Sequence, residues 1–399
     1  MKAENIRSRD DLNLYNSLLK EPDVIRVNES IKRAEQKGPY STRRHLLSTS
    51  IRLSPQMAPT VHSMKDECAE KLGLDIPLEL YVYNSPQFNA ACFKPEDGRL
   101  FIMFSSSLLE AFTGSELRFV MGHELGHHLY QHHDIPIGYI LKGSQKPSPK
   151  LALQLFSWSR YAEISADRAG ALCANDLQGV ARSLFRLSSG LSDNVIQFSL
   201  NDFLAQMDDM QEDEENQTNR GPKEDWFSTH PFSPLRVKAL QLFHNSEHSC
   251  VDGMSTDDLE IGVHSLMGFM EPSYLDGRTR PSEIMRRLLF SGSIAVINAS
   301  GEVTDEEISK FESFFGDHSL SEKLNVDKII KDLPERIQMA RENTSISQRM
   351  QVLRDLCLMV VADNKAGLKE RAVVIDIAEA LNVSPAFAET HLDVTRELD

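Results

Sequence analysis

The ten residues VMGHELGHHL, numbers 120–129, contain the pattern His-Glu-x-x-His at His123, Glu124 and His127. A capping-box spacing at Thr113–Glu116 and a proline at 136 predict a helix over residues 113–133. Residues four apart share a helical face, so two imidazoles there can each place a nitrogen about 2.0–2.1 Å from one zinc ion. Glu124 lies roughly 100° around the helix, where it can take a proton from a zinc-bound water. The pattern predicts a hydrolytic zinc site.

A glycine directly precedes each histidine of the motif, Gly122 before His123 and Gly126 before His127. Each costs a helix interior about 1 kcal/mol relative to alanine, so we expect another part of the protein to approach this helix closely. A buried strand or a bound peptide would fit this requirement.

A second long helix is predicted from Ser148-Pro149 to about Ala174. It carries Glu163 and Asp167 four residues apart in an otherwise largely apolar stretch, where two carboxylates are costly to bury unless they are paired or bound to a metal. We expect Glu163 to be the third zinc ligand and Asp167 to accept an N–H from a ligand histidine, His127. The alternative is a surface arrangement of Asp167 without a metal.

Three further histidines, His128, His132 and His133, follow the motif at spacings that do not continue its helical face. We expect them to face solvent or to lie in a loop. The remaining histidines have no evident partner in the sequence.

Composition excludes several functional classes. The chain has 399 residues, 41% of them hydrophobic, and a formal net charge of −16, which argues against binding to nucleic acid or to an anionic membrane surface. Its apolar runs are far shorter than the ~20 residues of a membrane-spanning helix, and no secretory signal is visible. Five cysteines, widely spaced and odd in number, argue against a disulfide framework. We therefore expect a soluble protein of the cytoplasm.

The order of predicted elements indicates an α+β fold that is mostly α. Short β-rich runs at 78–83, 87–93 and 100–104 predict a small antiparallel sheet just before the two metal-binding helices. We expect an N-terminal helical segment (1–50) that packs on a catalytic domain (51–248), and an all-helical domain (249–399). Eight acidic residues between 206 and 226 predict a mobile acidic loop.

The C-terminal domain contains a weak internal repeat at an offset of 63 residues. Residues 294–303 align with 357–366, and this register places Glu307 opposite Glu370 and Phe311 opposite Val374. Two helix–turn–helix units with apolar faces would bury each other. Chance similarity between two amphipathic hairpins is the alternative.

The HELGH motif, the later EISAD motif (163–167) and the segment STHPFSPLR (228–236) together resemble the HtpX and CaaX-prenyl-protease family of zinc metallopeptidases. The segment NAACF (89–93) is similar to the edge strand of that family. The resemblance covers roughly residues 50–245 and implies a zincin-like domain of the HExxH…ExxxD (gluzincin) type. Familiar members carry transmembrane helices, which this chain lacks.

The resemblance implies one Zn²⁺ per chain, held by His123, His127 and Glu163, with Glu124 as general base. It also implies that His230 stabilises the transition state, that Arg236 supports the site together with Asp167, and that the strand at Asn89 and Ala90 pairs with the substrate backbone. The C-terminal repeat resembles the TerB module of tellurite resistance proteins, for which we expect a helical interaction domain without a metal.

These observations predict a zinc-dependent metalloendopeptidase whose substrate is a protein or peptide, with no nucleic acid and no integral membrane segment. A protein partner is expected at the C-terminal helical domain. A non-proteolytic metal hydrolase that uses the same ligands is one alternative. The main alternative to the peptidase is a zinc-containing binding or scaffold protein that acts through the C-terminal helical domain. Glu124 distinguishes the peptidase from the scaffold protein, because a purely structural zinc site needs no general base.

Overall fold

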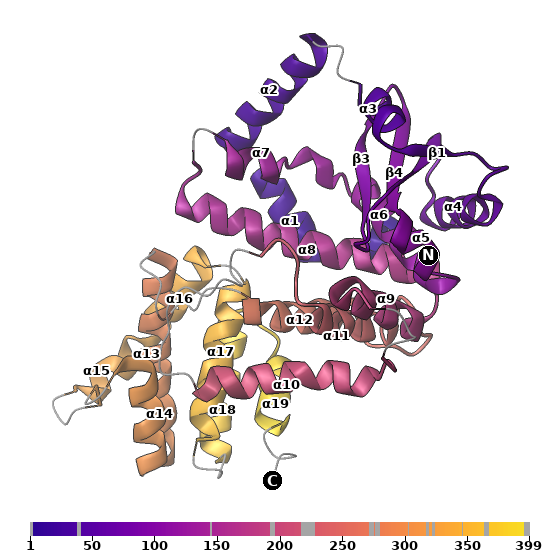
Figure 1. Ribbon diagram of the computed structural model, residues 1–399. Coiled ribbons are helices and arrows are strands. Elements are labelled where there is room, and N and C mark those ends of the chain that lie inside the picture. The colour runs from indigo at the N-terminus through magenta and orange to yellow at the C-terminus, as the bar shows by residue number, and fades with distance from the viewer. Residues whose placement is uncertain are drawn as a thin grey trace. The chain divides into compact units, whose positions relative to one another are not determined.

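Two helices, α6 (Ser115–Leu129) and α8 (Pro149–Ala174), pack against each other in the computed structural model (Figure 1). Both lie close to their predicted limits, and Ser148 caps α8 by accepting a hydrogen bond from the backbone N–H of Leu151. The structure describes residues 3–37, 41–143, 146–191, 196–216, 228–270, 275, 280–301, 303–316, 319–320, 324–344, 346–362 and 367–394.

The two glycines of α6 allow this close packing. A Cβ atom added to Gly126 would lie 2.9 Å from the Cβ of Ala169, and one added to Gly122 would lie 2.7 Å from the Sγ of Cys173. Real Cβ atoms do not approach other atoms so closely, so the bare glycine backbones set the distance between the helices. The expectation of a strand or a bound peptide at these glycines is wrong, since their neighbour is helix α8.

A four-stranded sheet precedes α6 in the order β1-β2-β4-β3. Its strands are β1 (Ile51–Leu53), β2 (Leu78–Tyr83), β3 (Ala90–Glu96) and β4 (Arg99–Ser105). β1 and β3 are antiparallel to their neighbours, whereas β2 and β4 are parallel. The α+β, mostly helical fold is confirmed, but the sheet is mixed and not purely antiparallel.

Side-chain chemistry explains why β4, and not β3, is central. In β4, Leu100, Ile102 and Phe104 are fully buried, as a central strand requires. β3 contains Pro95, which cannot donate a ladder hydrogen bond and is therefore suited to an edge. The hairpin between β3 and β4 turns at 97–98, where both residues have positive φ.

The remaining elements of this part of the chain are helices around the α6–α8 pair. Packing against α8 are α1 (Arg9–Leu18), α4 (Pro59–Leu72), α9 (Leu177–Ser189) and α11 (Ser233–His244), and α12 (Thr256–Met267) packs on α11 and α1. The others are η1 (Ala3–Ile6), α2 (Pro22–Lys37), α3 (Thr42–Thr49), α5 (Ser106–Ala111), η2 (His132–Asp134), α7 (Ile137–Lys142), α10 (Leu200–Asn216) and η4 (Gly268–Met270). The apolar faces of α4, α5, α6, α9, α11 and α12 form the main core with α8 and the sheet. Helices α1, α2 and α7 pack on α8 in a second apolar cluster, and α3 packs on the sheet in a third.

The acidic segment is only partly as predicted. Residues 206–216 belong to α10, so the predicted loop is wrong for that half, and residues 217–226 lie outside the described residues. No described helix is long and apolar enough to cross a membrane.

The chain divides into two compact units, Met1–Met270 and Glu271–Asp399. This division falls later than the predicted boundary at 248. The reason is α12, whose Leu259, Val263 and Met267 are buried in the core of the first unit.

The second unit consists of helices in its described parts. These are α13 (Arg280–Ser300), α14 (Asp305–Phe315), α15 (Val326–Lys331), α16 (Leu333–Asn343), α17 (Ile346–Val360), α18 (Leu368–Ala380) and α19 (Pro385–Val394). α13 packs on α17 and α18, so the two copies of the sequence repeat bury each other.

The repeat is also visible in helix capping. Glu307 begins α14 with a capping box on Thr304, and Glu370 accepts a hydrogen bond from the backbone N–H of Gly367 at the start of α18. Both glutamates are buried at the N-terminal turn of the second helix of their copy. The offset of 63 residues therefore relates positions with the same structural role.

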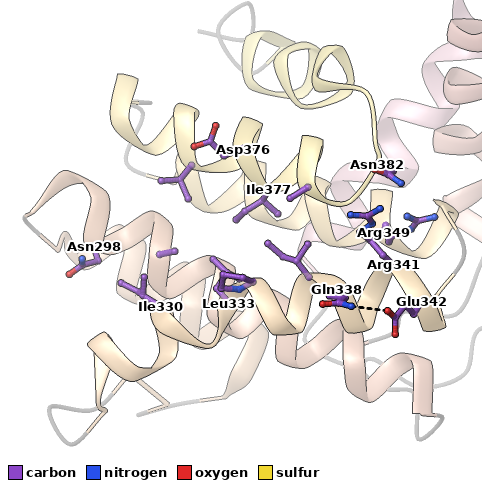
Figure 2. Close-up of a pocket in the computed structure, with 15 residues that line it drawn as sticks. Asn298, Ile330, Leu333, Gln338, Arg341, Glu342, Arg349, Asp376, Ile377 and Asn382 are labelled. Atoms are coloured by element: carbon purple, nitrogen blue, oxygen red, sulfur yellow. Dashed lines mark hydrogen bonds between the residues drawn. The ribbon is translucent and has the colours of Figure 1, made fainter.

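A cavity of about 960 Å³ opens among the helices of this second unit (Figure 2). Leu333, Ile337 and Ile377 form its apolar wall, and Arg341 and Arg349 lie together at one end. Burial, together with the neighbouring charge of Arg341, lowers the pKa of Arg349 below its usual value.

Candidate metal centre

Helix α6 places His123 and His127 side by side, one turn apart, as predicted from their spacing. Their Nε2 atoms are 3.1 Å apart, and the two rings are nearly perpendicular. Both nitrogens therefore point to the same place beside the helix. Burial lowers the pKa of His127 well below its usual value, reinforced by the charges of neighbouring histidines, which favours the neutral imidazole that ligates metals.

Helix α8 brings Glu163 to the same place. Its Oε2 lies 3.5 Å from Nε2 of His123, and its Oε1 lies 3.5 Å from Nε2 of His127. The Oε2 atom is buried and has no hydrogen-bond partner among the residues that the structure describes. Burial raises the pKa of Glu163, but the charges of His123 and Arg236 lower it by more. The pKa therefore lies below its usual value, which favours the ionised carboxylate.

The three groups fit a zinc ion. His123, His127 and Glu163 each offer a ligand atom, and these atoms lie within 4.8 Å of one another. Ligand atoms of a tetrahedral zinc ion with bonds of about 2.0–2.1 Å are about 3.3 Å apart, close to the separations of 3.1 and 3.5 Å in the structure. Three acceptors that converge on one point repel each other unless a cation joins them. The arrangement therefore suits a metal with three protein ligands.

Asp167 supports the site, but its partner differs from the predicted one. Its Oδ1 lies 2.9 Å from Nδ1 of His123, so the expected contact with His127 is wrong. Burial alone would lower the pKa of His123, but this hydrogen bond and the charge of Glu163 raise it above its usual value. The contact fixes the tautomer that leaves Nε2 free for a metal.

His127 has a different neighbour. Its Nδ1 lies 2.8 Å from Nδ1 of His132, and His132 is buried beside Trp158. The expectation that His132 faces solvent or a loop is wrong, because the chain leaves the helix at Gln131, which has a positive φ of 60°, and turns back. His128 and His133 are half-buried and contribute no atom to the three-ligand group.

Glu124 lies on the side of the site toward the sheet. Its Oε2 accepts a hydrogen bond of 2.7 Å from the backbone N–H of Cys92 in β3. Burial raises the pKa of Glu124, as does the charge of Glu163, and the Cys92 hydrogen bond only partly opposes this. A carboxylate of raised pKa beside the ligands is suited to accept and return a proton. Sequence reasoning did not identify Cys92, since its contribution is a backbone group.

Two residues reach the site from the segment at α11. Arg236 donates to both carboxylate oxygens of Asp167, at 2.8 and 2.6 Å, and its Nη2 lies 3.4 Å from Glu163. His230 is largely exposed, and its Nε2 lies 3.6 Å from Oε1 of Glu163. Arg236 therefore lies behind the ligands, whereas His230 lies at their solvent side.

Strand β3 is an edge strand of the sheet at the same place, and no further strand among the described residues pairs with it. The backbone carbonyl of Asn89 accepts a hydrogen bond from the N–H of Ser105 in β4, so by alternation the backbone groups of Ala90 and Cys92 point away from β4. The contact from Cys92 to Glu124 agrees with this alternation. The side chain of Asn89 donates to the hydroxyl of Tyr83.

Comparison with known proteins gives two family matches. Residues 55–146 and 148–243 match the model of peptidase family M48, and residues 286–390 match that of the tellurite resistance protein TerB. The chain is 32% identical over 169 residues to the plastoglobule-localized metallopeptidase 48 of Arabidopsis thaliana, covering 40% of this chain and 49% of that protein.

It is also 23% identical over 219 residues to a protease HtpX homolog of Helicobacter pylori, covering 45% of this chain and 66% of that protein. The match thus spans about half the length of the first relative and about two thirds of the second. No solved structure matches it.

Proposed function

We propose that this chain, which matches peptidase family M48 over residues 55–146 and 148–243 and TerB over residues 286–390, is a zinc-dependent metalloendopeptidase. The observation that carries the proposal is the convergence of His123, His127 and Glu163 beside Glu124. The match to peptidase family M48 and the relatives' printed names support a peptidase, and the geometry supports one zinc ion per chain.

His123, His127 and Glu163 would hold the metal. Zinc in such a site supplies a Lewis acid and lowers the pKa of a water ligand to about 7. Asp167 keeps His123 in the required tautomer, and the positive charge of Arg236 balances the negative charges of Asp167 and Glu163 on α8. Each of these residues acts by holding a ligand in place.

Glu124 is the general base of the proposed reaction. Its carboxylate accepts the proton of the attacking water and passes it to the amine that leaves, and the raised pKa brings it nearer to neutral pH. The backbone N–H of Cys92 fixes the carboxylate during both transfers. His230, at the solvent side of Glu163, donates to the oxygen on which charge develops.

The outer edge of β3 would bind the substrate backbone. An extended peptide could add to this edge as a further strand through the backbone groups of Ala90 and the carbonyl of Cys92, which point away from β4, while the N–H of Cys92 stays on Glu124. Asn89 lies at the start of the edge, and Glu124 faces its middle. A peptide bond held there would lie next to the general base, as hydrolysis requires.

The second candidate function is binding through the C-terminal unit. The cavity of about 960 Å³ has the size and the apolar wall of a ligand site, which favours an interaction role for this unit (Figure 2). A protein partner at the TerB domain is part of the proposal.

A cytoplasmic location is also proposed, supported by five cysteines that are all free, whereas the Arabidopsis relative is named for plastoglobules.

A metal-replacement experiment tests the proposal. Protein stripped with a chelator should lose cleavage of a mixed peptide library and regain it with one equivalent of zinc. His127→Ala should not regain it, whereas His128→Ala, on the same helix but outside the ligand group, should. A zinc-loaded wild-type chain that cleaves no member of the library would favour the binding function.

A further inference from the structure

The N-terminal helix α1 carries a carboxylate that the catalytic site does not use directly. Asp11 is fully buried, and its side chain accepts hydrogen bonds from four residues, one just before α1, one on η2 and two on α8. The donors are Arg7 at 2.8 and 3.1 Å, His132 at 3.0 Å, Trp158 at 3.0 Å and Ser165 at 2.7 Å. Such an arrangement keeps the carboxylate in a single orientation.

Asp11 is linked to the metal centre through one intermediate side chain. Its Oδ2 contacts Nε2 of His132, and Nδ1 of His132 contacts Nδ1 of His127. If Nε2 of His127 faces a metal, its Nδ1 carries the proton and donates to His132. His132 then accepts at Nδ1 and donates from Nε2, which requires an acceptor. Asp11 is that acceptor, so one set of tautomers satisfies every contact.

The other ligand histidine is supported more directly. His123 contacts Asp167 on α8 at 2.9 Å, without an intermediate. Each ligand histidine is thus connected to a buried carboxylate. His123 contacts Asp167 of α8 directly, and His127 reaches Asp11 of α1 through His132. Burial alone would raise the pKa of Asp11, but hydrogen bonds from His132 and Arg7 hold it well below its usual value, so the carboxylate is charged.

Helix α1 lies outside the part of the chain that matches the peptidase family, which begins at residue 55. It is held in place at its start, where Ser8 and the backbone N–H of Arg9 donate to Glu260, and Glu260 also pairs with buried Arg168 of α8. The side-by-side packing of α1 on α8 is visible in Figure 1. The N-terminal segment is therefore positioned to affect the metal centre.

We propose that Asp11 is a positioning residue for the metal centre, which orients His132 and through it the ligand His127. This inference rests on the proposed zinc site. It assigns the N-terminal helix a role in metal affinity and not only in packing. The competing explanation is structural: Asp11 holds α1 on α8, and its contact with His132 has no effect on His127.

The test measures zinc affinity of the full chain by competition with a chromophoric chelator, together with the melting temperature of the metal-free protein. Asp11→Asn and His132→Phe should each weaken zinc binding by about 10–100-fold, the range typical of groups that orient a ligand. Because the two residues act in series, the double variant should be no weaker than the worse single variant.

Tyr15→Phe is the matched control. Tyr15 lies one turn beyond Asp11 on α1, and its hydroxyl donates to Gln131 and Asp134 on either side of His132. Removing that hydroxyl loosens the same helix from the same segment without touching His132. Its zinc affinity should equal that of the wild type, even where the melting temperature of its metal-free form falls.

Three outcomes decide the inference. Weaker zinc binding in Asp11→Asn and His132→Phe, non-additive in the double variant and absent in Tyr15→Phe, supports it. Unchanged zinc affinity in either variant overturns it, as does an equal loss in Tyr15→Phe. A wild-type chain that binds no zinc would instead refute the proposed function, so the two failures are distinguishable.

Discussion

A single methyl group at Gly126 should disturb the metal centre without altering any ligand. In Gly126→Ala the new Cβ would lie 2.9 Å from the Cβ of Ala169 and 3.1 Å from the Cα of Ala166. Carbon atoms pack best at about 3.5–4.0 Å, so α6 and α8 must separate by roughly 0.5–1 Å. His127 is on one helix and Glu163 on the other, and the separation therefore acts on their distance of 3.5 Å.

The magnitude follows from two opposing effects. Alanine is favoured over glycine inside a helix by about 1 kcal/mol, whereas overpacking costs about 1–3 kcal/mol, so the net loss of stability is about 0–2 kcal/mol. Zinc sites tolerate deviations of only about 0.2 Å in ligand distance. Zinc affinity should therefore fall on the order of tenfold or more, which corresponds to about 1.4 kcal/mol.

The assay is a zinc titration against a competing chelator, with urea unfolding of the metal-free protein in parallel. Gly138→Ala, in α7, is the matched control, since nothing lies within 4 Å of its new Cβ and its zinc affinity should not change. Ala169→Gly combined with Gly126→Ala should recover part of the affinity. Full zinc affinity in Gly126→Ala alone would refute the reasoning that the glycines set the ligand geometry.

The remaining predictions concern single side chains. Glu163→Ala should lower zinc content and melting temperature together, because the metal joins two helices; one zinc per chain in that variant would exclude Glu163 as a ligand. Asp167→Asn should weaken zinc binding more mildly, by roughly 10–100-fold in a chelator titration, and an unchanged affinity would deny it a role in orienting His123. His230→Ala should lower kcat by about 10²–10³-fold with zinc content and KM nearly unchanged, whereas a lower melting temperature with normal kcat would make it structural. Burial lowers the pKa of His133 from 6.5 to about 4, so the unfolded chain takes up the proton first and stability is lost as pH falls from about 6.5 toward 4. Melting curves at about pH 7 and pH 5 should show a larger loss in the wild type than in His133→Gln, and equal losses would contradict this.

The sequence predicted the parts of the site that depend on helical periodicity. His123, Glu124 and His127 required only that α6 be a helix, and the apolar stretch around Glu163 predicted that this carboxylate is buried. Local signals also predicted the start of α8, since a capping serine and a proline at the first turn act within a few residues.

Periodicity could not predict how the two helices are rotated against each other. That rotation depends on which small residues touch, and it brings Asp167 to His123 and not to His127. The role of His132 depends on Gln131, whose left-handed backbone conformation turns the chain away from the axis of α6. Asp11 is separated from His132 by more than a hundred residues, so only the tertiary structure brings them together.

The order of the strands was likewise a long-range property. Adjacent runs in the sequence predicted adjacent strands, but the strand buried on both faces is β4, so it takes the central position between β2 and β3. Pro95 in β3 was a local indication of an edge strand.

Turnover of a peptide by zinc-loaded Glu124→Gln tests the central claim most directly. The substitution keeps the shape of the side chain and all three ligands but removes the base, so the variant should hold one zinc per chain and lose at least about 10²–10⁴-fold in kcat. Wild-type turnover by a fully zinc-loaded Glu124→Gln chain would contradict the account.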